Sequence, residues 1–217
     1  MQWPLLNVLT EPERRDLIKS ARRRRFTRNE VIFHEGDLGD TLLLMSKGHV
    51  AIRMHTPLGD VATVRILRPG EFFGELAVIS PGPRNASAIA LDSAEALSVG
   101  RSQLDSLRRE HPQIERVLVE ALIAEVRRLS QRLVDAMYVP VEKRLWRRLA
   151  ELGVIFGSDD VPATTIPLTQ ETLAQLVGCT RPTANRVMRE GEVAGAIAIA
   201  RGRLEILDPA AIERRGR

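Results

Sequence analysis

Four polar side chains between residues 181 and 186 have the types and spacing needed to read base edges in duplex DNA. Arg181 and Arg186 can each donate two hydrogen bonds to guanine, and Asn185 can pair with adenine. Thr183 can contact a thymine methyl group or a phosphate. If the segment is helical, these four side chains face outward while the apolar residues between them face inward. The pattern predicts a recognition helix for the major groove.

Two short helices with a tight break are needed to present that face, and the sequence predicts them at 169–177 and 181–190. Thr169 and Thr180 can cap the two amino termini. Gly178 lies at the break, where a residue with positive φ is usually needed. The spacing predicts a helix-turn-helix. The alternative is a helical hairpin that contacts no DNA, with Arg181 and Arg186 simply solvated.

A hairpin follows the second helix. Apolar runs at 196–200 and 204–207 flank Arg201-Gly-Arg203, which predicts two strands and a tight turn. Arginines at such a turn can hold phosphates, as can helix amino termini. The predicted DNA-contacting residues are Thr169, Thr180, Arg181, Thr183, Asn185, Arg186, Arg201 and Arg203.

One long helix is predicted from about Ser102 or Pro112 to Tyr138, with Pro140 ending it. Apolar residues recur in it by three and four. Positions a are Val119, Val126 and Leu133, and positions d are Leu122, Leu129 and Ala136. Such a heptad seam requires a partner helix, so we expect a homodimer. The alternative is that the stripe packs on the protein's own β domain.

The stretch from Val31 to Val99 predicts an antiparallel barrel or sandwich, because short β-rich runs alternate with Gly, Pro and Asp. The predicted strands are 31–33, 41–45, 50–54, 61–67, 86–91 and 94–99. A helix is expected ahead of them at 11–24. The basic run Arg22–Arg25 then forms a solvated surface at the end of that helix.

Composition excludes several classes of protein. The 217 residues carry a net charge of +4, which permits nucleic-acid binding without establishing it. Cys179 is the only cysteine, so an intrachain disulfide and a cysteine-only metal cluster are excluded. The four histidines lack paired metal-ligand spacing, and no nucleophile–base constellation is evident. We expect a protein without catalytic activity or bound metal, located in the cytoplasm, with no membrane-spanning or secretory segment.

Taken together, the motifs resemble those of the CRP/FNR family of transcription regulators over essentially the whole length. The resemblance is carried by Glu35-Gly-Asp37, Gly48, Gly70-Glu-Phe-Phe-Gly-Glu-Leu-Ala77, Arg84-Asn-Ala86 and residues 168–186. It implies an α+β fold with a cyclic-nucleotide-binding-type β-roll at 1–111, a dimerisation helix at 112–139 and a winged helix-turn-helix at 140–217. It also implies a near-palindromic DNA operator and RNA polymerase as partners.

The family's cyclic-nucleotide binders imply roles for residues of the roll. A short helix including Gly74, Glu75, Leu76 and Ala77 would hold cAMP or another cyclic nucleotide, with Glu75 on the ribose hydroxyl. Arg84 would pair with the phosphate, next to Asn85 and Ala86. Leu129 and Ser130 of the long helix would meet the base. The alternative is that Glu75 and Arg84 form an ion pair within an empty roll.

This chain departs from the family pattern at four positions. Asn85 replaces a Ser or Thr, and Leu129 replaces a Thr that hydrogen-bonds adenine. Pro182 replaces a Glu that reads a C·G pair, and Gly191, where an apolar residue is usual, is expected to shorten the recognition helix. Two alternative functions follow: a cyclic-nucleotide sensor acting through protein partners, and a ligand-independent regulator with a vestigial roll.

Overall fold

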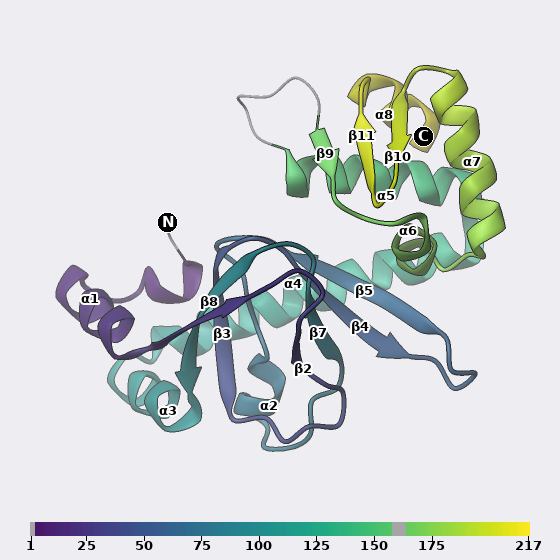
Figure 1. Cartoon of the computed structure of the whole chain (residues 1–217). Coiled ribbons are helices and arrows are strands. Elements are labelled where there is room, and N and C mark those ends of the chain that lie inside the picture. Colours follow the sequence, from purple (N-terminus) through teal and green to yellow (C-terminus); the bar gives the residue numbers. More distant parts are fainter. Residues whose placement is uncertain (1–2, 158–163) are drawn as a thin grey trace. The chain divides into compact units, whose positions relative to one another are not determined.

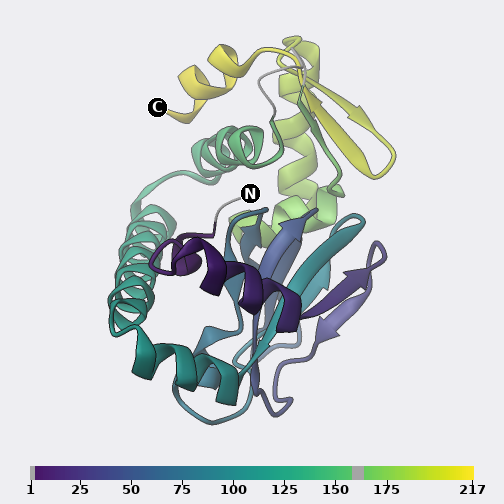
Figure 2. The same cartoon turned by 90° about the vertical axis from the view of Figure 1, so that its left-hand side faces the viewer.

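The computed structural model describes residues 3–157 and 164–217 (Figures 1 and 2). The chain divides into two compact units, one of residues 1–55 and 64–128 and the other of residues 56–63 and 129–217. The long helix α4, Gln113–Tyr138, contributes to both. In the described residues, no helix has the length and hydropathy to cross a membrane.

The first unit contains the expected β-roll. One sheet has the order β1-β8-β3-β6, and the other has the order β2-β7-β4-β5. The strands of the first sheet are β1 (Arg22–Phe26), β8 (Ala94–Gly100), β3 (Thr41–Lys47) and β6 (Phe72–Phe73). Those of the second are β2 (Val31–Phe33), β7 (Ser87–Ala90), β4 (Val50–His55) and β5 (Val61–Leu67). The six predicted strands are all present, and the family-type roll is confirmed.

Strand β3 is buried on both faces, which explains its continuous apolar run. Leu43 and Met45 join a core within the roll, whereas Leu42 and Leu44 pack on the other face of the sheet. That second core also contains the N-terminal Trp3, whose indole N–H donates to the carbonyl of Met45 at 2.7 Å. Because successive side chains of a strand point to opposite faces, one segment supports two cores.

The basic run Arg22–Arg25 is not the end of a helix, so that prediction was wrong. Helix α1, Glu11–Ser20, ends before it, and the arginines form most of β1. Strand β1 pairs antiparallel with β8, from Arg22 opposite Ser98 to Phe26 opposite Ala94. The ladder to a strand 70 residues away overrides the local helical pattern, as tertiary context commonly does.

Four further helices complete this unit: η1 (Pro4–Leu6), α2 (Glu75–Ile79), α3 (Arg101–Glu110) and the first part of α4. Pro112 separates α3 from α4, which decides between the two predicted starts of the long helix. Gly74 caps α2 with φ +81°, a conformation that favours glycine.

The second unit contains the predicted helix-turn-helix and hairpin. Its elements are α5 (Val141–Phe156), β9 (Thr164–Ile166), α6 (Gln170–Val177), α7 (Arg181–Val193), β10 (Ile197–Ala200), β11 (Arg203–Ile206) and α8 (Pro209–Gly216). The strands form a sheet of order β10-β11-β9. Strand β9 and helix α8 were not expected. Gly191 lies inside α7 and does not shorten it, because its lack of a side chain makes room for the ring of Trp146.

Candidate DNA-binding groove and ligand cavity

The helix-turn-helix has the local geometry that its capping residues predict. The hydroxyl oxygen of Thr169 accepts the N–H of Thr172 at 3.1 Å, and that of Thr180 accepts the N–H of Thr183 at 3.4 Å. Gly178 has φ +71° at the end of α6. A β-branched or bulky residue would be strained there, so the sharp turn between the helices depends on glycine.

A groove of about 550 Å³ runs between the start of α6, the start of α7 and the β10–β11 hairpin. Four of the predicted DNA-contacting residues line it: Thr169, Arg181, Arg201 and Arg203. All four are exposed. The fold thus brings a helix terminus, a recognition-helix arginine and two hairpin arginines to one concave surface, where they can meet phosphates and base edges together.

The other predicted DNA-contacting residues lie outside this groove. Arg186 is exposed on α7, but it is held by Glu142 of α5 at 2.6 Å and by Glu190 at 3.1 Å. Asn185 is half-buried, and its Oδ1 is shielded from solvent without a partner in the described part of the chain. Thr180 and Thr183 hydrogen-bond each other through their hydroxyls at 2.9 Å.

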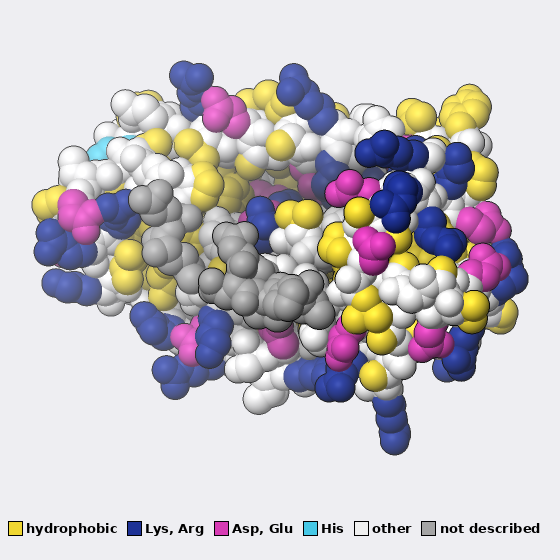
Figure 3. Space-filling model, turned by 90° about the horizontal axis from the view of Figure 1, so that it is seen from above, with side chains coloured by type: hydrophobic (Ala, Val, Ile, Leu, Met, Phe, Trp, Pro, Cys, Tyr) yellow, Lys and Arg dark blue, Asp and Glu magenta, His cyan; other side chains and the backbone are white. Residues whose placement is uncertain are grey.

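Positive charge is spread widely over the face of the molecule that Figure 3 shows. In Figure 3, Lys and Arg side chains protrude at many separate points, with Asp and Glu among them. Net charge alone therefore does not locate a DNA-binding surface in this protein, and the groove is identified by its geometry.

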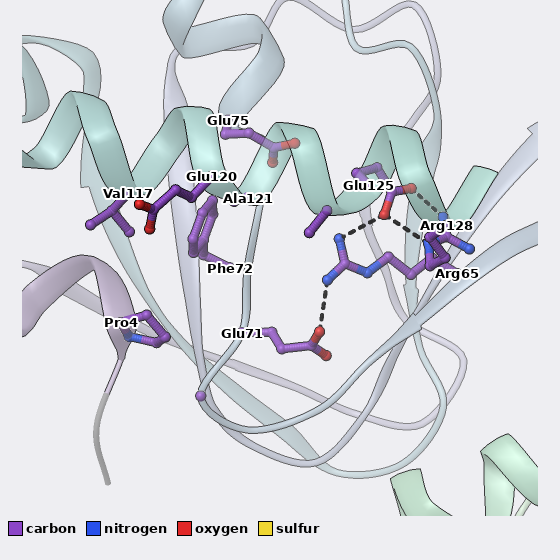
Figure 4. A pocket seen from close by; sticks show the side chains of 12 residues that line it. Pro4, Arg65, Glu71, Phe72, Glu75, Val117, Glu120, Ala121, Glu125 and Arg128 are labelled. Carbon is purple, nitrogen blue, oxygen red and sulfur yellow. Dashed lines mark hydrogen bonds and ion pairs between the residues drawn. The ribbon is translucent and has the colours of Figure 1, made fainter. Parts of the chain in front are cut away.

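A second concave site, the ligand cavity, lies in the first unit between the roll and α4 (Figure 4). It measures about 330 Å³, within the usual range of small-molecule sites. Its charged lining residues are Arg65, Glu71, Glu75, Glu120, Glu125 and Arg128. Of the residues that the resemblance assigned to a ligand, only Glu75 lines it.

Glu75 fits the role of a hydroxyl acceptor. Burial raises the pKa of its carboxyl group. It has no hydrogen bond or ion pair to another side chain among the described residues, and it faces the cavity (Figure 4). The backbone N–H of Glu75 donates to its own carboxylate, which leaves acceptor capacity on this partly buried group. A hydroxyl group of a bound molecule, such as that of a ribose, could donate to it.

Arg84 is engaged with the protein itself. It is 6% exposed and donates to the backbone carbonyls of Gly74 and Thr41, both at 2.8 Å. Its guanidinium also lies over the ring of Phe33, 4.3 Å from the centroid. Desolvation lowers its pKa. Among the described residues no salt bridge joins Arg84 and Glu75, so the simple pair weighed as an alternative is not found, although the two charges attract each other at longer range.

The remaining assigned ligand residues do not line the cavity: Gly74, Leu76, Ala77, Asn85, Ala86, Leu129 and Ser130. Leu129 and Ser130 belong to the second unit. Sequence reasoning missed Arg65, Glu71, Glu125 and Arg128. One signal was available for Arg65, because a charged residue interrupts the otherwise apolar strand 61–67.

The heptad seam of α4 is largely uncovered. Val126 and Leu133 are each 62% exposed, and Val119 is 50% exposed. Met137 and Tyr138, at the end of the same helix, are also exposed. An exposed apolar stripe on a helix is the kind of surface that a partner helix covers in a coiled coil. Within the described residues, no group of three or more His, Cys, Asp or Glu side chains could hold a metal ion.

Two family models match this chain. Residues 23–111 match the cyclic nucleotide-binding domain, and residues 143–215 match the Crp-like helix-turn-helix domain. The chain is 34% identical to a CRP-like cAMP-activated global transcriptional regulator of Mycobacterium tuberculosis, over 88% of this chain and 87% of the relative. It is 30% identical to the cyclic AMP receptor protein of Thermus thermophilus, over 97% of this chain and 95% of the relative.

Solved structures agree. The catabolite activator protein of Thermus thermophilus is 28% identical, with a TM-score of 0.56 over 98% of each chain. FixK2 of Bradyrhizobium japonicum, at 16% identity, has the same fold, with a TM-score of 0.78 over 91% of this chain and 98% of that one. The chain therefore belongs to the CRP/FNR family, and it is a DNA-binding transcription regulator with a cyclic nucleotide-binding-type roll and a winged helix-turn-helix.

Proposed function

We propose that this regulator binds a near-palindromic DNA site as a homodimer, and that a cyclic nucleotide in the ligand cavity changes its affinity for that site. The proposal of DNA binding rests on the groove, which is lined by Thr169, Arg181, Arg201 and Arg203. In this proposal, Arg181 reads a base while the hairpin arginines hold the backbone.

The exposed heptad seam of α4 supports the proposal that the protein is a homodimer. Two seams packed together would remove Val119, Val126 and Leu133 from water in both copies. A two-fold axis along the paired helices would then present two recognition helices to half-sites one DNA turn apart, about 34 Å. RNA polymerase is the further partner expected of a regulator of this class.

The cavity and Glu75 support the proposal that a cyclic nucleotide binds. Glu75, which lines the cavity, would accept a ribose hydroxyl. Arg84 does not line the cavity, so it would have to leave the carbonyls of Gly74 and Thr41 before it could pair with the cyclic phosphate. The relatives named as cAMP-activated make cAMP or a similar nucleotide the first compound to test. A ligand can switch DNA binding only if it favours one dimer state over another.

The test is selection of bound sequences from random duplex DNA by the full-length protein, with no nucleotide, with cAMP and with cGMP. Enrichment of a near-palindrome supports DNA binding, and a nucleotide-dependent change in its affinity supports ligand control. No enriched sequence under any condition would overturn the DNA-binding proposal and favour a sensor that acts through protein partners. Equal affinity in all three arms, with no heat of nucleotide binding, would indicate a vestigial roll.

A further inference from the structure

Arg65 is held by two carboxylates on the wall of the ligand cavity. It projects from β5 and lies between carboxylates from two other segments (Figure 4). Its Nη2 donates to Glu71 at 2.7 Å, and its Nη1 donates to Glu125 of α4 at 3.4 Å. The side chain is 32% exposed. A guanidinium held from two sides has little rotational freedom, so its remaining donors point in defined directions.

The carboxylates of this brace are themselves anchored. Glu71 also accepts the backbone N–H of Arg68 at 2.8 Å. Arg128 donates to the carboxylate of Glu125 through two of its nitrogens. It also donates to the carbonyl of Val64 at 3.1 Å. The network links β5, the turn after it and α4. Arg65 is therefore positioned by Glu71, six residues later, and by Glu125, 60 residues later, on the wall where a ligand would lie.

A fixed guanidinium distinguishes guanine from adenine. It carries five N–H donors, and the brace uses one on each terminal nitrogen. Guanine presents two adjacent acceptors, O6 and N7, which an arginine can bind together. Adenine presents N7 beside an N6 amino group, so one donor of the arginine would face another donor.

The charge of the cavity favours a base rather than a phosphate next to Arg65. Four carboxylates line the cavity, from Glu71, Glu75, Glu120 and Glu125, against the two guanidiniums of Arg65 and Arg128. Arg65 is directly paired with two of the four. An anion placed next to Arg65 would be repelled by the carboxylates of Glu71 and Glu125, whereas the edge of a neutral base would not.

We propose that Arg65 is the base-selecting residue of the ligand cavity, that it makes the protein prefer a guanine cyclic nucleotide over an adenine one, and that Glu71 and Glu125 are its positioning residues. This inference rests on the proposed function, since it requires that a cyclic nucleotide binds in the cavity.

The experiment is calorimetric titration of the full-length protein with cGMP and with cAMP. A bidentate arginine–guanine pair is worth about 1–3 kcal/mol, so the parent should prefer cGMP about 5- to 150-fold. Arg65→Gln should reverse the preference, because glutamine pairs with N6 and N7 of adenine. Arg65→Lys keeps the charge without the planar fork, so it should lose the preference while still binding cAMP.

Glu125→Gln tests the brace and should reduce the preference without removing Arg65. Glu120→Gln is its matched control: Glu120 lines the same cavity on the same helix but pairs with Arg116. The ratio of the two affinities should not change in this control. A thermal melt of each variant verifies folding, and Arg65→Lys keeps the test decisive if Arg65→Gln does not fold.

The outcomes separate the two proposals. Equal or tighter binding of cAMP by the parent would overturn the base assignment and leave ligand control standing. So would an equal loss of both nucleotides in Arg65→Gln, which would indicate contact with the phosphate. If neither nucleotide binds, both the base assignment and ligand control are overturned, whereas the proposal of DNA binding stands on its own test.

Discussion

Gly191 of α7 packs directly against the indole ring of Trp146 on α5. A β-carbon at residue 191 would clash with Cη2 of that ring and lie 3.1 Å from Cζ3. The indole also has the guanidinium of Arg215 over it, 5.2 Å from the centroid. The glycine therefore sets how closely the recognition helix approaches the rest of its unit.

Gly191→Ala should destabilise the protein despite alanine's better helix propensity. The propensity gain is about 1 kcal/mol, whereas overpacking a tight contact costs about 1–3 kcal/mol. We expect the free energy of unfolding in urea to fall by up to about 2 kcal/mol. Gly100→Ala is the control, since Gly100 has φ −72° and open space around it. A stability gain in Gly191→Ala would show that Trp146 can move aside.

Arg181→Ala should relax discrimination at one base pair of the binding site by about 1–3 kcal/mol. Arg181 is exposed at the start of α7 and lines the groove. Binding to single-base variants of the selected sequence measures this. Arg189→Ala, on the same helix but outside the groove and paired with Glu192, should leave the sequence preference unchanged. An unaltered preference in Arg181→Ala would contradict its role.

Glu142→Gln should strengthen DNA binding about two- to fivefold at low salt. Arg186 must leave Glu142 before it can reach DNA, and the neutral variant loosens that pair and removes a negative charge. The gain should shrink as salt rises, because exposed pairs are screened. A titration of DNA affinity against salt concentration measures both effects. The same gain in an Arg186→Ala background would show that Glu142 does not act through Arg186.

Val126→Asp combined with Leu133→Asp should give a monomer that binds DNA weakly. Both side chains are well exposed within one chain, so the charges should not disturb its own fold. Buried in a dimer seam, two carboxylates per chain would be strongly unfavourable. Sedimentation velocity at micromolar concentration measures the mass of each variant. Arg127→Glu is the control, because Arg127 is exposed on the side of α4 away from the seam, and this variant should remain a dimer. The dimer proposal fails if the parent itself sediments as a monomer on DNA.

Glu75→Gln should raise the melting temperature at neutral pH and not near pH 4. Burial raises the pKa of Glu75 from 4.5, so the folded state holds its proton more tightly than the unfolded chain. Stability contributed by this group therefore falls as pH rises from about 4.5 through the raised value. Glutamine has no proton to lose. Melting curves at several pH values should show the difference, and Glu110→Gln, at an exposed site, should show none.

The sequence by itself determined the elements whose signals are local. Thr169, Gly178 and Thr180 mark the helix-turn-helix because caps and positive φ depend on residues a few positions apart. The heptad seam and six of the eight strands of the roll are likewise evident from periodicity and turn residues. The family resemblance added the kind of domain at each end, and the matching family models confirm both kinds.

Only the tertiary structure decided features that join distant residues. Arg22–Arg25 became a strand because β8 supplies a hydrogen-bonding partner far along the chain. Gly191 became a packing contact because Trp146, 45 positions earlier, occupies its side-chain space. Arg65 meets Glu125 because the fold brings β5 and α4 within the reach of a salt bridge. Periodicity records which face of an element is apolar, but it does not record which side chains of two separate elements come into contact.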